Sequence, residues 1–430
     1  MSLKNTLFNR LDLSLPPEVK RTFIIELVAG VFIAIGSGCF SPYCGLIARQ
    51  DFNAGEFLIG VLSAGTAAGA LACILSSGLV PRGREKEAYA VSCAAGRFLV
   101  VFMAFCTGAP VFCWLGFFAA MLSVLPGPQY NILMQRLYPI EFRGRLMGLA
   151  RVNVAIFQLA SIFISGRFMH GPESWRTVFI VSGICFTAGS LLYLLWRVPP
   201  PEKEEEKTDV WKNIKGSMSL MGEDRIHLYL ILILTVTVVA VNIQIVIMPI
   251  FQADVLKMDP PSLSVVATLG SLAMMPGYIY WGRFVDKRGS AAAYSLQNLV
   301  LLSLPLSYFA AKNYLWIIPG TVAAGFANAG VEIAWRTLLM ELSKPGQERR
   351  VQTLHGFFDG VRCLLGIGMG VFLIAFINCI GAGLKYVFAA SAVIQLCGII
   401  PLMLLLGRRK KGKKGIMDEN NTRASGSGGA

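Results

Sequence analysis

The residues best suited to do chemistry in this chain are charged side chains inside long apolar segments. Glu332 and Arg336 are four residues apart, and Asp359 and Arg362 are three apart, so each pair would share one face of a helix. Arg97 differs, because no acidic residue lies close to it in the sequence. An ionisable group is costly within lipid and usually faces a cavity or another charge. These residues are therefore candidates for a polar site inside a membrane.

Arginine and polar neutral side chains favour a site for a negatively charged solute. A guanidinium group binds carboxylate or phosphate through two parallel hydrogen bonds. We therefore expect a substrate-binding cavity that uses Arg97, Gln129, Asn153, Asn242, Gln244, Trp335, Arg336 and Arg362. An acid beside an arginine would be ionised, and a solute that displaces it would let the acid take up a proton. The candidates for proton coupling are Glu26, Glu332 and Asp359.

Each of these candidates also has a structural interpretation. The acid–arginine pairs could neutralise each other and hold helices together. Arg151 and His355 lie near the ends of their apolar segments, where snorkelling to the membrane surface would explain them. Aromatic residues such as Trp335 and Tyr130 are more often packed between helices than bound to a ligand.

The elements that must position these residues are membrane-spanning helices. The chain has 430 residues, of which 55% are hydrophobic and 15% charged, with a mean hydropathy of +0.60. A soluble protein carries roughly a quarter charged residues. The apolar residues form runs long enough to cross a bilayer core of about 30 Å, whereas buried strands of a soluble α/β protein are only about 4–8 residues long. The composition therefore predicts an all-α polytopic membrane protein.

Hydropathy predicts about twelve transmembrane helices in two bundles of six. The expected spans lie near 22–47, 55–80, 87–107, 109–135, 146–168, 175–197, 226–251, 263–282, 290–310, 314–340, 352–377 and 384–407. They divide the chain into an N-terminal bundle and a C-terminal bundle, 22–197 and 226–407. A charged central loop, 198–225, joins the two bundles. A short N-terminal segment and a basic, flexible C-terminal tail complete the chain, 1–21 and 408–430.

The distribution of Lys and Arg predicts the orientation. With both termini in the cytoplasm, 29 of the 39 Lys and Arg residues lie in cytoplasmic segments and six in outside loops. This positive bias favours an inner- or plasma-membrane protein with cytoplasmic termini. Loops and a tail facing anionic lipid explain the net charge of +14, so no nucleic-acid partner is expected. The ten cysteines include no CxxC pair, so neither a metal site nor another cofactor is indicated.

Two similar phrases indicate an internal repeat. "GLVPRGREK" (78–86) and "GRFVDKRG" (282–289) each follow a long apolar segment, and their first glycines are 204 residues apart. Arg143 and Arg349 follow later segments at an offset of 206 residues. Nearly equal offsets predict two pseudo-symmetric halves.

These phrases resemble the major facilitator superfamily of transporters. The family's loop signature, Gly-x-x-x-Asp-Arg/Lys-x-Gly, is matched by Gly282, Asp286, Lys287 and Gly289, and "YPIEFRGR" (138–145) also resembles a family phrase. The copy at 78–86 is shortened and has lost the Asp. The resemblance implies a cytoplasmic latch that closes as the halves rock, formed by Gly282, Asp286, Lys287, Gly289, Arg143 and Arg349. The simpler alternative is that its basic residues only set topology.

The resemblance and the in-membrane charges together predict a secondary active transporter rather than an enzyme. Its expected cargo is a small organic anion or zwitterion, moved by alternating access as a monomer in lipid, with protons as a hypothetical coupling ion. The fifth predicted span, 146–168, lacks the Gly-Pro phrase of drug–proton antiporters, and the sugar-porter phrases are missing after the sixth and twelfth spans. An efflux carrier for amphipathic compounds stays as an alternative, and a non-transporting sensor on a transporter scaffold as a second.

Overall fold

The structure is a bundle of long helices. The computed structural model describes residues 16–81, 83–171, 173–199, 215–343 and 347–404. Every regular element within these ranges is a helix, which confirms the predicted all-α fold. The predicted tail 408–430 lies outside the described residues, as do most of the N-terminal segment and of the central loop, and the side chain of Arg349.

The N-terminal half contains the first six predicted spans. Its elements are α2 (Pro17–Phe40), α3 (Cys44–Gln50), α4 (Glu56–Leu79), α5 (Glu85–Met103), α6 (Ala109–Val124), α7 (Gly127–Leu137), α8 (Ile140–Phe168), α9 (Ser174–Leu192) and the 3₁₀ turn η1 (Tyr193–Leu195). The predicted span 109–135 is broken into α6 and α7 at Pro126, because proline has no backbone N–H to continue a helix.

The C-terminal half contains the other six predicted spans and has its own breaks. It contains α11 (Leu220–Glu223), α12 (Arg225–Asp254), α13 (Pro260–Arg288), α14 (Ser290–Leu301), α15 (Ser303–Ala310), the 3₁₀ turn η2 (Tyr314–Ile317), α16 (Ile318–Leu342) and α17 (Glu348–Cys379). The last helix is Lys385–Leu404.

Ten of the described helical segments are long and apolar enough to cross a membrane. Two predicted spans, 87–107 and 290–310, fall outside that group although helices occupy both positions. α5 carries four charged residues, and α14 and α15 are separate helices of 12 and 8 residues. The structure therefore supports a membrane-embedded helical bundle, with two predicted spans that are more polar or more broken than the others.

Glycines allow the closest helix contacts. A Cβ added at Gly325 of α16 would lie 1.9 Å from the backbone oxygen of Gly270 on α13. A Cβ at Gly65 of α4 would lie 2.4 Å from the backbone oxygen of Phe117 on α6. Such approaches strengthen dispersion contacts between helices where lipid removes the hydrophobic driving force.

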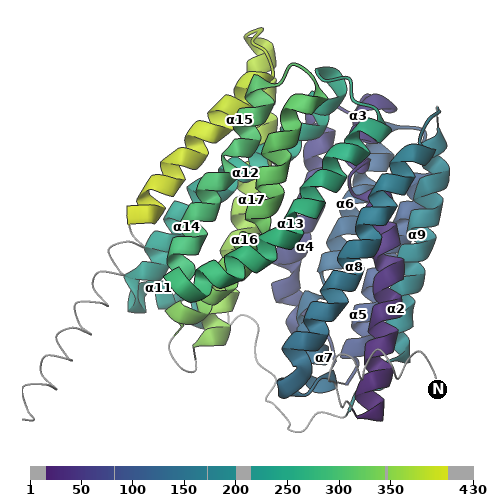
Figure 1. Cartoon of the computed structure of the whole chain (residues 1–430), viewed down its shortest axis with the longest axis vertical. Helices are drawn as coiled ribbons and strands as arrows, with labels where there is room; N and C mark the ends of the chain where they lie inside the picture. Colours follow the sequence, from purple (N-terminus) through teal and green to yellow (C-terminus); the bar gives the residue numbers. More distant parts are fainter. Residues whose placement is uncertain (1–15, 82, 172, 200–214, 344–346, 405–430) are drawn as a thin grey trace, which may run out of the picture.

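The two halves stand side by side and join at one end (Figure 1). The contacts between halves run from α4 to α17, from α8 to α13, and from α3 and α4 to α12. At the end that carries α3, Arg49 Nη2 lies 2.6 Å from Asp254 Oδ2 of α12, and Gln50 Nε2 donates to the backbone oxygen of Met258 at 2.7 Å. We call this end the α3 end and the opposite one the α7 end.

Candidate functional site

A cavity of about 910 Å³ lies between the two halves. It is lined by residues of α7, including Tyr130 and Asn131. It therefore lies toward the α7 end, away from the contacts that join the halves at the α3 end. In Figure 1 the ribbons of the two halves separate toward this α7 end. Four lining residues come from α17 and the rest from the N-terminal half. The volume is in the range of sites for small organic ligands.

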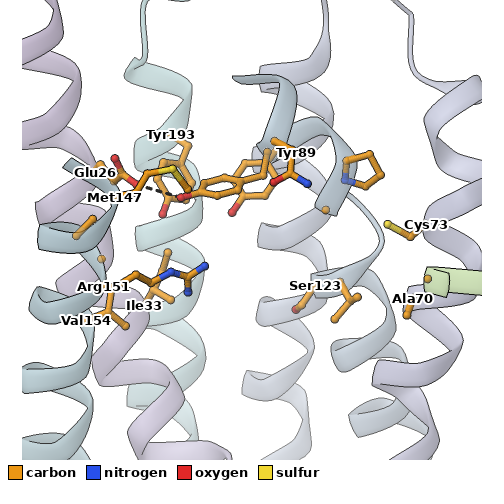
Figure 2. Close-up of a pocket in the computed structure, with 18 of the residues that line it drawn as sticks. Glu26, Ile33, Ala70, Cys73, Tyr89, Ser123, Met147, Arg151, Val154 and Tyr193 are labelled. Atoms are coloured by element: carbon orange, nitrogen blue, oxygen red, sulfur yellow. Dashed lines mark hydrogen bonds between the residues drawn. The ribbon is translucent and has the colours of Figure 1, made fainter. Parts of the chain in front are cut away.

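Two arginines of the N-terminal half line this cavity. Arg97 of α5 donates from Nη1 to Ser190 Oγ at 2.7 Å, and its guanidinium lies 5.1 Å from the centre of the Phe186 ring. Arg151 of α8 is exposed to the cavity beside Val154 (Figure 2). Within the described residues, neither arginine forms an ion pair with a carboxylate. Both guanidinium groups therefore have bonding capacity available for an anion.

One buried carboxylate faces the same space. Glu26 of α2 is only 4% exposed and accepts hydrogen bonds from the hydroxyls of Tyr130, at 3.0 Å, and of Tyr138. Arg151 lies close enough to interact electrostatically with it. Figure 2 shows Glu26 beside Met147 and near Tyr193. The two hydroxyl donors hold this side chain in one orientation.

Tyrosine rings form one wall of the cavity. The ring centres of Tyr89 and Tyr130 are 5.3 Å apart, and those of Tyr89 and Tyr193 are 5.4 Å apart. All three residues line the cavity. Tyr193 is buried, whereas Tyr89 and Tyr130 are partly exposed, so their rings present aromatic surface to a ligand.

The C-terminal half contributes a carboxylate that is already paired. Asp359 Oδ1 on α17 accepts hydrogen bonds from Arg362 Nε at 3.0 Å and Nη2 at 2.8 Å. The Asp359 side chain is 53% exposed and that of Arg362 only 3%, so the acid lines the cavity and the arginine lies behind it. Arg362 also lies 6.0 Å from the centre of the Trp335 ring. The predicted pair is thus present, with its negative end toward the cavity.

Several predicted binding residues do not line this cavity. Asn153 Nδ2 donates to the Leu27 backbone oxygen, and Gln244 Nε2 donates to Gln395 Oε1. Asn242 Nδ2 donates to the Val238 backbone oxygen. Gln129, Trp335, Arg336 and Arg362 are also absent from the lining. Of the predicted substrate-binding set, Arg97 alone lines the cavity, and the set as a whole stays a prediction.

Glu332 and Arg336 do not form the expected pair. Tyr278 of α13 donates its hydroxyl to Glu332 Oε2 at 3.0 Å, and both Glu332 and Arg336 are exposed. No ion pair joins them within the described residues. Glu332 is also outside the cavity lining, so two of the three predicted coupling acids, Glu26 and Asp359, face this space.

The predicted latch residues lie at the α7 end, and those with described side chains do not contact one another across the halves. Asp286 and Lys287 are exposed at the end of α13, and Gly289 has a φ of +86° that glycine adopts without strain. Gly282 has no atom within 4 Å of an added Cβ. Arg143 Nη2 donates to the backbone oxygens of Gln135 and Tyr138 in its own half. The role of these residues as a latch stays a prediction.

The sequence prediction omits Arg151, Tyr89 and Tyr193 from the site. For Arg151, the spacing along α8 is a usable signal. Met147, Arg151 and Val154 recur on one face of α8, and all three line the cavity. Tyr89 and Arg97 are likewise two turns apart on α5. Hydropathy alone does not reveal such faces, because it does not specify how each helix is rotated.

The arrangement of two helical halves around a polar cavity is typical of membrane transport proteins. The sequence model of the Major Facilitator Superfamily matches residues 27–366 and 230–425. The chain belongs to this superfamily, as its loop signature indicates. No curated protein matches the chain in sequence.

Solved structures agree on the fold. A mutant of the nucleoside transporter NupG aligns with a TM-score of 0.71 at 11% identity, covering 89% of this chain and 99% of that one. A bacterial homolog to the human lysosomal transporter Spinster, inward-facing and unoccupied, aligns with a TM-score of 0.67 at 14% identity, covering 91% and 98%. A D-xylose-proton symporter aligns with a TM-score of 0.63 at 13% identity, covering 89% and 96%. At these identities the similarity is one of fold.

Proposed function

We propose that this protein is a secondary transporter that moves a small organic anion or zwitterion by alternating access. The observation that carries this proposal is the pair Arg97 and Arg151, which line one cavity without forming an ion pair within the described residues. Buried or partly buried cations are costly unless a counter-charge is supplied. A carboxylate or phosphate group on the solute would supply it and match the planar guanidinium geometry.

The orientation proposed from Lys and Arg assigns a state to this structure. With both termini cytoplasmic in the inner or plasma membrane, the α7 end faces the cytoplasm and the α3 end faces outward. The cavity then opens inward, and the Arg49–Asp254 contact closes the outer side. Asp286, Lys287 and Arg143 would come together only when the inner side closes. Their separation here supports that sequence of events.

Proton coupling is the finer part of the proposal. Glu26 and Asp359 both line the cavity. Protonation of Glu26 would remove a negative charge beside Arg151 and make the cavity more attractive to an anion. Anion binding and proton binding at Glu26 would then favour each other, as symport requires.

Thermal stabilisation of the purified full-length protein tests the anion site. Organic anions, zwitterions, sugars and lipophilic cations are added in turn, since binding to the native state raises its apparent stability. We expect a class of anions to stabilise the wild type, with about tenfold or greater loss of affinity in Arg97→Gln and Arg151→Gln, because each removes a charge-assisted hydrogen bond. Arg167→Gln is the matched control, as this arginine lies over the Phe163 ring and outside the cavity lining.

Two results would contradict the proposal. Stabilisation by lipophilic cations alone would favour an efflux carrier for amphipathic compounds. Arginine variants that respond to anions as the wild type does would exclude Arg97 and Arg151 as the anion site, whatever the cargo is.

A further inference from the structure

The tyrosine wall differs from ordinary aromatic packing, because two of its three tyrosines are partly exposed residues that line the cavity. Tyr193 is buried and backs the wall, with its ring centre 4.4 Å from that of Trp196. Tyr89 and Tyr130 are partly exposed, and their rings are inclined at 37° to each other. Aromatic rings prefer offset or tilted arrangements with centres about 4.5–7 Å apart. A flat ring on a ligand could therefore join this series as a further member.

The wall and the two arginines belong to one site. Arg97 lies within electrostatic range of both Tyr89 and Tyr193, and Arg151 within range of Tyr130 and Tyr193. Tyr89 and Arg97 are eight residues apart on α5, a rise on the order of 12 Å. Both are long side chains, so they can reach the two ends of a ligand that is shorter than this rise.

We propose that the transported solute contains a planar ring joined by a short linker to a carboxylate or phosphate group. The ring would stack on Tyr89 and Tyr130, and Arg97 and Arg151 would bind the anionic group. This inference rests on the anion transport proposed above and adds the ring. Aliphatic anions of the same size would satisfy the arginines and leave the tyrosine faces without a matching partner.

Two matched pairs of compounds test for the ring. 3-Phenylpropionate is compared with 3-cyclohexylpropionate, and phenyl phosphate with cyclohexyl phosphate, by thermal stabilisation of the purified full-length protein over a range of concentrations. The cyclohexyl compounds are the more hydrophobic, so nonspecific burial would favour them. We expect the opposite order in one pair or both, with the preferred pair showing which anionic group the arginines select.

Variants of Tyr89 then test whether the ring of the ligand stacks on this tyrosine. Tyr89→Leu should weaken binding of the aromatic member about 3- to 10-fold and leave the cyclohexyl member unchanged, since an aromatic contact adds roughly that much beyond area burial. Tyr89→Phe keeps the ring and should bind like the wild type. Tyr229→Leu is the control, because Tyr229 is exposed on α12 and outside the cavity lining.

The outcomes separate this inference from the anion proposal. If phenyl and cyclohexyl anions bind equally and Arg97→Gln weakens both, the anion site stands and the ring inference is wrong. If Tyr89→Leu weakens binding of both members of a pair equally, the tyrosine contributes apolar contact without a preference for an aromatic ring. That result also overturns the inference. If none of the four anions binds while another organic anion of the earlier panel does, the ring inference is wrong and the anion site stands. If no organic anion binds, both proposals fail.

Discussion

Glu26 is a buried carboxylate that lines the cavity. It accepts two tyrosine hydroxyl hydrogen bonds and lies within range of Arg151. We expect the wild type to bind its best anion about 5-fold or more tightly at low pH than at high pH, because protonation removes a competing negative charge. Glu26→Gln imitates the protonated form and should bind tightly at every pH. Thermal stabilisation by that anion between pH 5.5 and 8 measures both.

The matched control for Glu26 lies on the same helix. Glu18 is exposed near the start of α2 and outside the cavity lining, so Glu18→Gln should keep the pH dependence of the wild type. A Glu26→Gln protein whose affinity still rises at low pH would assign the proton to another group, and Asp359 is then the next to test.

Residue positions along the chain predicted part of the site, and helix rotation decided the rest. Arg97 was expected in a binding site from its isolation inside an apolar segment, and it does line the cavity. Arg336 carries the same charge, but it lies outside the cavity lining. Asn153 and Gln244 are polar for a local reason, since each bonds to a neighbouring helix. A polar side chain in a membrane helix thus indicates that it has a polar partner. It does not show whether that partner is a ligand or another helix.

At the scale of helices, the contact between α3 and α12 controls the closed end. Asp254 accepts three hydrogen bonds from Arg49, with Nη2 to Oδ2 at 2.6 Å the shortest. Asp254→Asn removes the ionic part of this contact, and partly exposed pairs of this kind contribute up to about 1 kcal/mol. We expect amide hydrogen exchange in residues 44–50 and 250–258 to rise by up to about fivefold.

The control for this closure is an ion pair at the same end that does not join the halves. Glu173 pairs with Arg176 at 3.2 Å within the N-terminal half. Glu173→Gln should leave exchange in α3 and in the end of α12 unchanged. Equal exchange in Asp254→Asn and the wild type would show that apolar packing alone holds this end closed.

Gly325 is one of the glycines that let helices of the C-terminal half approach closely. A methyl group at Gly325 would meet the Gly270 backbone at 1.9 Å, and a backbone cannot move aside as a flexible side chain can. We expect Gly325→Ala to destabilise the protein by about 1–3 kcal/mol. Gly368→Ala is the control, because an added Cβ there meets nothing within 4 Å, and alanine favours a helix. Thermal unfolding compares the two, and equal stability would mean that α13 and α16 separate at little cost.

Hydropathy located the helices better than their breaks. Helices occupy all twelve predicted positions in the described residues, whereas the interruptions at Pro126 and Leu302 were not expected. A window of about twenty residues averages over a local break, so α6–α7 and α14–α15 each read as one span. The break before α7 matters to the site, because α7 contributes Tyr130 to the cavity wall.

At the scale of the molecule, the offsets of 204 and 206 residues between matching phrases predict two similar halves. The family match over 27–366 and 230–425 shows the superfamily, and the internal repeat stays a prediction. The cavity between the halves could not be predicted, since the offset says nothing about which faces meet. Its place depends on the contacts of α4 with α17 and of α8 with α13.

The lining of the cavity is unequal, because among the described residues of the C-terminal half only those of α17 contribute to it. Under the transport proposed above, the choice of cargo then depends mainly on the N-terminal half. A chimaera that keeps residues 16–195 and takes its C-terminal half from a relative would inherit this protein's choice of cargo. New specificities could arise by substitutions in one half while the machinery of opening and closing is left intact.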